Sequence, residues 1–255
     1  MLKIKIIFLL VISFFSNACA QKATFKEIRL KPNDKLYNTK ETTIIYPIIV
    51  TANPQADKLM NAQIKEEMLS PEENDKRSTR NILIQQLSKD GLGLINLSYE
   101  VTHNTNGLLS MYIYAEGCGA HCSSWNTYFN FYLQTGKEIT ITDIIAEAKI
   151  DSFRNIVLND KLKAFQKYKT EEITELKEDH IDSVSYDWIL ERVDSECTKS
   201  VSIYNFSLSN QMIEIIDPCE LPFMLRSQEP SYELKYTYQM IMPFLKPKFK
   251  QLLSK

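Results

Sequence analysis

Apolar and polar residues alternate along three consecutive segments in the middle of the chain. This alternation has the period of β-strands, whose successive side chains point to opposite faces of a sheet. The turn sequence Asn-Thr-Asn-Gly at residues 104–107 separates the first two segments and predicts a hairpin. The apolar positions are Ile95, Leu97, Tyr99 and Val101 in the first segment, Leu109, Met111, Ile113 and Ala115 in the second, and Phe129, Phe131 and Leu133 in the third.

A tether and a first strand within residues 21–43, then a second strand and two helices, are predicted before this hairpin. Residues 42–50, TTIIYPIIV, have strand character, and Pro47 predicts an edge position or a bulge because proline donates no hydrogen bond to a sheet. Asn53 and Pro54 offer an N-cap and a first-turn proline, and apolar residues then recur at helical spacing up to Met68. A second, short helix is expected near residues 81–87.

The second half of the chain changes from strands to helices and back. Helical spacing dominates residues 150–193, and strand character returns at residues 201–208, 212–216 and 232–241. Pro243 is expected to start a basic C-terminal helix. This order predicts an α+β fold, with a mainly antiparallel sheet and with helices inserted between the strand groups and packed on one face.

The first twenty residues, 1–20, are organised like an export signal. Two lysines precede an apolar run at residues 6–15, and small residues follow. The run is shorter than the ~18–20 apolar residues that a membrane-spanning helix needs. Ala18-Cys19-Ala20 fits an ordinary signal peptidase site, whereas residues 16–19 resemble a bacterial lipobox, which would make Cys19 the lipidated first residue. We favour lipidation, because free cysteines are uncommon at exit sites.

The composition and the motifs argue against nucleic acid and against a phosphate-containing cofactor as ligands. A formal net charge of −2 and a pI near 6.0 lack the basic excess of a nucleic-acid binder. Gly136-Lys137 lacks the remaining residues of a phosphate loop, and we expect no cofactor. The expected protein is exported to the periplasm or anchored at the outer membrane, and it touches a membrane only through a lipid anchor.

The stretch EGCGAHCSSW, residues 116–125, could serve three chemistries. Cys118, His121 and Cys122 could ligate zinc, but no second knuckle supplies the usual ligand pairs, and we expect no metal. A Cys/His nucleophile needs a reduced thiol, which an exported protein rarely keeps. The third alternative, a small disulfide ring between Cys118 and Cys122, is the one that we favour.

The cysteine count supports that choice. Four of the five cysteines remain after Cys19, an even number that allows three pairings. Local pairing joins Cys118 to Cys122 and Cys197 to Cys219, with the second bridge tying the start of one late strand to the end of the next.

Tyrosines occupy the second face of the predicted central strands. Tyr112, Tyr114, Tyr128 and Tyr132 share this face, and an exposed tyrosine cluster would suit a protein partner or a glycan. In an α+β fold the long helical segment can instead cover the face, and we expect it to do so. These tyrosines and His121 are the candidate binding residues.

The order of segments resembles a known family. The patterns YEVTHNTNGLLSMYIYAEGCGAH and NFYLQTGKEITITDII, followed by a late strand pair and a Pro-led helix, resemble the uncharacterised extracytoplasmic domain of the lysozyme-sensing bacterial anti-sigma factor, a domain that also accompanies some polysaccharide deacetylases. That family commonly has Gly-Gly-Ala-His-Gly in the loop, and here Cys118 and Cys122 replace both outer glycines. Pairing would explain why both positions changed to the same residue.

The resemblance also suggests how the chain is divided. The segment from Ile44 to Met68 resembles the smaller region that usually precedes this domain, which gives an N-terminal strand-helix region at 21–94 and a C-terminal α+β domain at 95–255. The resemblance implies an exported module that, in the anti-sigma factor, binds a protein ligand. It carries no known catalytic residues.

These observations favour a non-catalytic envelope module that binds a protein or a cell-wall ligand such as peptidoglycan. The alternative is an enzyme acting on cell-wall polysaccharide or peptide, in which His121 and a carboxylate would line a cleft. A lipoprotein with a purely structural role is the third alternative. A concave pocket that brings His121 together with Asp or Glu would favour the enzyme, and an exposed flat tyrosine surface would favour the binding module.

Overall fold

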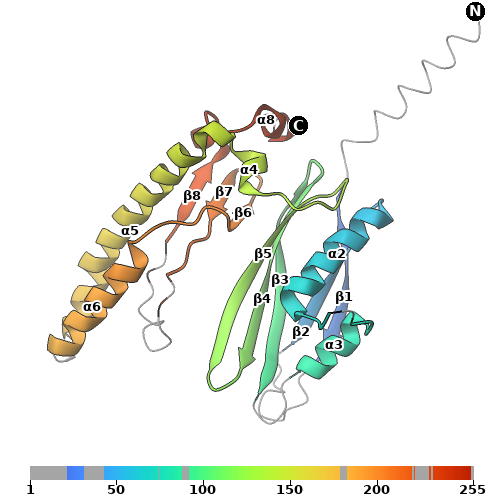
Figure 1. Cartoon of the computed structure of the whole chain (residues 1–255), viewed down its shortest axis with the longest axis horizontal. Helices are drawn as coiled ribbons and strands as arrows, with labels where there is room; N and C mark the ends of the chain where they lie inside the picture. Colours follow the sequence, from blue (N-terminus) through green and yellow to red (C-terminus); the bar gives the residue numbers. More distant parts are fainter. Residues whose placement is uncertain are drawn as a thin grey trace, which may run out of the picture. The chain divides into compact units, whose positions relative to one another are not determined.

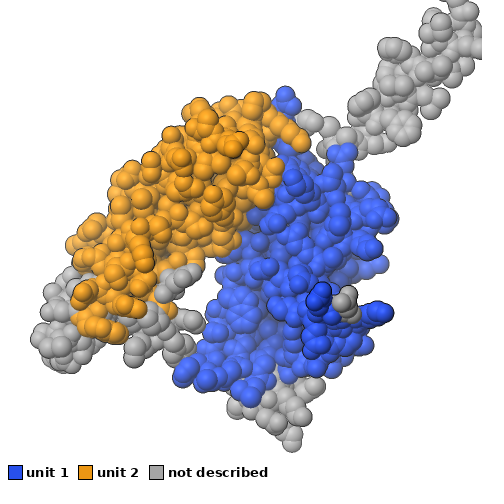
Figure 2. All heavy atoms as spheres, viewed as in Figure 1, with its two compact units in different colours: residues 1–139, 208–210, 251–255 blue, residues 140–207, 211–250 orange. Residues whose placement is uncertain are grey.

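The structure is a computed structural model that describes residues 22–31, 43–73, 75–87, 92–178, 183–219, 221, 230 and 232–253. The chain divides into two compact units (Figure 2). Unit 1 comprises residues 1–139, 208–210 and 251–255, and unit 2 comprises residues 140–207 and 211–250. The division of the sequence into an N-terminal region at 21–94 and a C-terminal domain at 95–255 stays a prediction.

Unit 1 is built on a five-stranded sheet in the order β1-β2-β3-β4-β5 (Figure 1). The strands are β1 (Thr24–Leu30), β2 (Ile44–Val50), β3 (Gly93–Thr105), β4 (Leu108–Cys118) and β5 (Cys122–Tyr132). All pairings are antiparallel except that of β2 with β3. Asn106 and Gly107 both have positive φ, +53° and +75°, as the tight turn between β3 and β4 requires. The predicted hairpin is confirmed.

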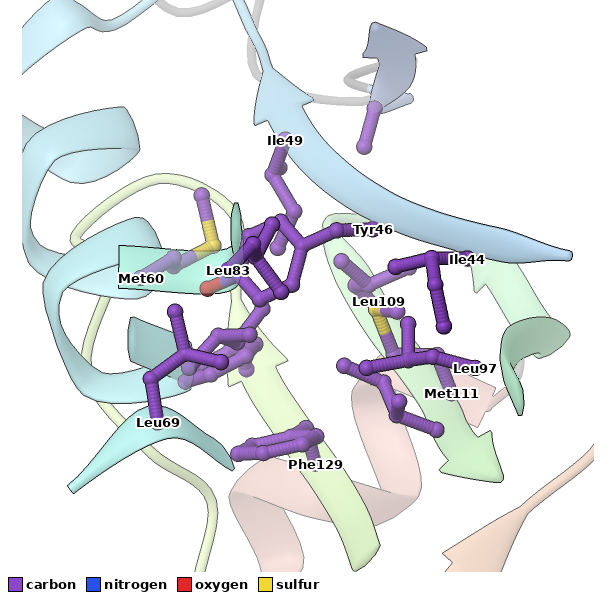
Figure 3. Packing of buried hydrophobic residues seen from close by; sticks show 14 of the residues in the cluster. Ile44, Tyr46, Ile49, Met60, Leu69, Leu83, Leu97, Leu109, Met111 and Phe129 are labelled. Carbon is purple, nitrogen blue, oxygen red and sulfur yellow. The ribbon is translucent and has the colours of Figure 1, made fainter. Parts of the chain in front are cut away.

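One face of this sheet packs against two helices, α2 (Pro54–Leu69) and α3 (Thr79–Gln86). Asn53 caps α2 by accepting a hydrogen bond from Gln55 N, and Ser78 caps α3 by accepting one from Asn81 N. Figure 3 shows the resulting core, into which Tyr46 points from β2. The labelled residues of this core are Ile44, Tyr46, Ile49, Met60, Leu69, Leu83, Leu97, Leu109, Met111 and Phe129.

Pro47 lies in β2 where the strand has left β3. The β2–β3 ladder contains one pair, Ile44 with Leu97, and Pro47 pairs only with Glu27 of β1. Further along β2, the Asn61 side chain of α2 takes the place of a neighbouring strand: its Oδ1 accepts from Ile49 N and its Nδ2 donates to Ile49 O, both at 2.8 Å. Strand β2 lies between β1 and β3 in the strand order, but Pro47 has no partner in β3. Proline is therefore tolerated here, because no hydrogen bond to β3 requires its missing N–H.

Unit 2 combines helices with a small sheet. Its helical elements are α4 (Ile141–Ile144), η1 (Glu147–Lys149), α5 (Ile150–Glu178), α6 (Ser183–Cys197), α7 (Tyr238–Ile241) and the first part of α8 (Pro247–Leu253), whose residues 251–253 belong to unit 1. The sheet runs in the order β6-β7-β8, with β6 (Phe206–Leu208), β7 (Met212–Ile215) and β8 (Leu234–Thr237). Lys161 of α5 is 2% exposed, and its Nζ lies 2.6 Å from Asp217 Oδ2 and 3.1 Å from Ser200 O. This buried ion pair fixes the segment after β7 to α5.

Three predicted elements differ from those observed. The strand expected at 232–241 ends at Thr237, because the Thr237 hydroxyl accepts a hydrogen bond from Met240 N and starts α7. Of the strand expected at 201–208, only the last three residues form β6. The basic C-terminal helix begins at Pro247 rather than at Pro243, since Phe244 is engaged in backbone pairing with Ala146.

The predicted α+β class is confirmed, with a mainly antiparallel sheet and helices between the strand groups. Within the described part of the chain, no helix combines the length and the apolar character that crossing a membrane requires. Cys19 and the predicted export signal lie outside the described residues.

Candidate functional site

The cysteine loop closes the β4–β5 hairpin. Cys118 and Cys122 are directly opposite each other, with Cα atoms 3.9 Å apart, and they form a disulfide. Gly119 N donates to His121 O within the loop. Because the two sulfur atoms are bonded to each other, neither is a thiolate ligand or a nucleophile in this form. Among the residues that the structure describes, no cluster of three or more His, Cys, Asp or Glu is placed to hold a metal ion.

The second disulfide lies in unit 2 and joins Cys197 to Cys219. Both bridges are the pairs expected from local pairing. Cys197 ends helix α6 rather than starting a strand, so the bridge ties that helix to the segment after β7. Disulfides persist in oxidising compartments, and the two bridges are therefore compatible with an extracytoplasmic location.

A pocket of about 770 Å³ opens beside the loop, entirely within unit 1. Helix α3 ends at Gln86, while β3 and β4 continue past it, and Leu87 forms an isolated bridge with Leu94 at this point. The described lining of the cavity at this point comes from the ends of α2 and α3, from β3, β4 and β5, and from the loop between β4 and β5. We call this cavity the Trp125 pocket; its lining residues are Met68, Gln85, Gln86, Leu87, Leu92, Gly93, Leu94, Gly117, Cys118, Gly119, His121, Ser123 and Trp125.

Trp125 is the largest side chain of this pocket. It lies on β5 opposite Ala115, on the same face as the core residue Phe129, but it is 45% exposed. A Cβ atom added to Gly117 would be 3.6 Å from Trp125 Cη2, so the indole lies against the backbone of β4. The sequence analysis missed Trp125; extending the alternation of Phe129 and Phe131 back along β5 would have placed it on the helix-covered face.

Neutral polar groups complete the lining. The Gln86 Nε2 donates to Leu69 O at 2.7 Å, and Gln85 Oε1 accepts from the Arg77 guanidinium. Arg77 in turn donates three hydrogen bonds from its guanidinium and one from its backbone N–H to the Asp75 carboxylate, and these bonds lower the Asp75 pKa to about 2. The amide groups at this rim are thus oriented by the protein before a ligand arrives.

The four tyrosines lie apart from this pocket, on the other face of the sheet. The rings of Tyr112 and Tyr128 are 5.6 Å apart, and Tyr112 Oη donates to Glu100 Oε2 at 2.6 Å. Tyr114, Tyr128 and Tyr132 are also partly buried. The structure therefore places His121 at the pocket but does not bring it together with the tyrosines, and the covering of the tyrosine face by the long helical segment stays a prediction.

Comparisons with known proteins give structural neighbours only. No protein-family model matches the sequence, and no curated protein matches it. A solved member of the DUF3298 family from Bacteroides fragilis matches with a TM-score of 0.57 and 13% identity, covering 94% of this chain and 100% of that one. A DUF3298 family protein from Pseudomonas aeruginosa matches with a TM-score of 0.51 and 12% identity, covering 91% and 96%. The chain thus shares its fold with solved proteins of an uncharacterised family, DUF3298.

Proposed function

We propose that this protein is an exported, non-catalytic module of the cell envelope, anchored through a lipid on Cys19, that binds a protein or a cell-wall ligand in the Trp125 pocket. The observation that carries the proposal is the pocket itself: an exposed tryptophan and oriented amide groups converge on a concave surface beside a disulfide-closed loop. A largely apolar pocket with a few convergent polar groups is the usual form of a binding site.

Three features support the cellular setting. The first twenty residues have the organisation of an export signal with a lipobox-like end at Cys19. The two disulfides suit an oxidising compartment. The sequence patterns around the loop resemble the extracytoplasmic domain of the lysozyme-sensing anti-sigma factor, which binds a protein ligand.

The composition of the pocket favours binding over catalysis. An enzyme that used His121 for acid–base chemistry on polysaccharide or peptide would need a partner such as a carboxylate near the reacting atoms. Of the described residues that line the Trp125 pocket, none is Asp or Glu. The chemistry available there is stacking and neutral hydrogen bonding, which suits recognition.

The proposal is tested by retention of the purified full-length protein on immobilised envelope material, with isolated cell wall and the envelope protein fraction assayed separately. Trp125→Ala should abolish retention on one of the two fractions. Trp188→Ala is the matched control, because Trp188 of unit 2 is the second tryptophan and has a similar exposure, 49% against 45%. Equal retention of both variants and the parent on both fractions would refute the proposal.

A further inference from the structure

The Trp125 pocket has no charged side chain among its described lining residues: they include no Asp, Glu, Lys or Arg. A ligand with a formal charge would lose hydration on entering and would find no opposite charge among the lining side chains that the structure describes. This described lining therefore suits a neutral group better than a phosphate, a carboxylate or an ammonium group.

The lining also has two chemical characters that face the same space. Leu92, Leu94 and the Trp125 indole offer flat or branched apolar surface, and Leu92 is 58% exposed. Around them, Gln85, His121 and Ser123 offer amide, imidazole and hydroxyl groups. The matching ligand has an apolar face and a rim of neutral hydrogen-bonding groups.

A pyranose ring has this form, because its axial C–H groups make an apolar face and its hydroxyls make a polar rim. An N-acetyl substituent adds a neutral amide, which can pair with a glutamine amide, and a methyl group suited to leucine. We infer that the Trp125 pocket binds a neutral N-acetylated sugar, with one pyranose ring stacked on the Trp125 indole. The volume of about 770 Å³ lies in the range of pockets that enclose small-molecule ligands.

The protein holds this surface in place before binding. The indole rests against the β4 backbone at Gly117, where an added Cβ would lie in ordinary contact with Trp125 Cη2, at 3.6 Å, and closer than usual to Gly93 O, at 3.2 Å. The Cys118–Cys122 bridge fixes the end of the same hairpin. A preformed platform lowers the ordering cost of binding, which matters for a small neutral ligand.

This inference rests on the proposed function and is tested by a direct titration. In full-length protein carrying Trp188→Phe, Trp125 is the only tryptophan, and its fluorescence reports on the pocket. Titration with the tetramer of N-acetylglucosamine should give a saturable change. Calorimetry should detect the same binding to the parent, weakened at least about tenfold by Trp125→Ala and less by Trp125→Phe, which keeps an aromatic face. Thermal unfolding checks that each variant is folded.

The deacetylated tetramer, titrated at a pH below the pKa of its amino groups, is the matched control ligand, because it has the same rings but carries ammonium groups instead of neutral amides. It should bind at least about tenfold more weakly. Equal binding of the two tetramers, or binding of the acetylated one that is unaffected by Trp125→Ala, would overturn the inference.

The failure of this inference can be told apart from failure of the proposed function. If neither tetramer binds but Trp125→Ala still abolishes retention of the protein on the envelope protein fraction, the occupant is a polypeptide, and the sugar inference is wrong while the proposed function stands. If Trp125→Ala changes neither titration nor retention, both are wrong.

Discussion

Two glycines with nearly the same positive φ allow a sharp test of how unit 1 is packed. Gly107, in the β3–β4 turn, has φ +75°, and Gly136, in the turn after β5, has φ +71°. A Cβ added to Gly107 would meet nothing within 4 Å, whereas one added to Gly136 would lie 2.5 Å from Ala56 O and 2.8 Å from Ala56 Cα, in the first turn of α2.

The two alanine variants should therefore differ in stability. Gly107→Ala carries only the cost of a left-handed conformation, about 1–2 kcal/mol. Gly136→Ala carries the same cost plus the overlap with the α2 backbone, which adds about 1–3 kcal/mol and gives a total of about 2–5 kcal/mol. The obstacle is backbone, which cannot rotate away as a side chain can.

Urea unfolding of the purified protein measures both free energies of unfolding, and an unchanged m-value checks that the unfolding transition is the same. The expected order is parent, then Gly107→Ala, then Gly136→Ala. Losses that agree within about 0.5 kcal/mol would refute the close packing of this turn on α2.

Three further changes test the interior. Tyr46→Phe should leave the free energy of unfolding unchanged or raise it by about 1 kcal/mol, because the buried Tyr46 hydroxyl has no hydrogen-bond partner among the described residues; a clear loss would contradict this. Asp217→Asn should lower the free energy of unfolding by about 3–5 kcal/mol, because it leaves Lys161 buried without a countercharge. Asp151→Asn removes one partner of the exposed pair with Arg154 and should lower it by less than about 1 kcal/mol in the same urea assay. Burial lowers the His103 pKa below 6.5, so the unfolded chain binds a proton first as the pH falls, and the free energy of unfolding should decrease below a pH of about 6.5. This free energy should depend less on pH in the His103→Gln variant. An unchanged pH dependence in that variant would exclude His103 as its source.

The central strands could be predicted because their pattern is local. Alternation from Ile95 to Leu133 and the Asn106-Gly107 turn determine two hairpins, and the asparagine–proline pair before α2 supplies its cap. The disulfide pairs followed from the cysteine count and from short separations. Each of these signals involves residues that lie close together in the sequence.

The pocket could not be predicted in the same way. Its lining combines the ends of α2 and α3 with β3, β4 and β5, and this depends on how two helices are placed against a sheet formed by distant residues. Trp125 gave a weak signal, because the alternation that identifies it continues from buried phenylalanines. At the end of β8 the alternation was misleading, since the local capping hydrogen bond of Thr237 overrides it.

The most direct test of the account is site-specific photocrosslinking in cells that export the protein. A benzophenone side chain at Leu92, which lines the Trp125 pocket, is compared with one at Leu59, which lies on α2 outside the pocket and is equally exposed, 58% against 57%. A ligand held in the Trp125 pocket should give an adduct from position 92 that is absent from position 59, is lost with Trp125→Ala, and is shortened by either a muramidase or a protease. The same adducts from both positions, or an adduct from position 92 that persists in Trp125→Ala, would contradict this prediction.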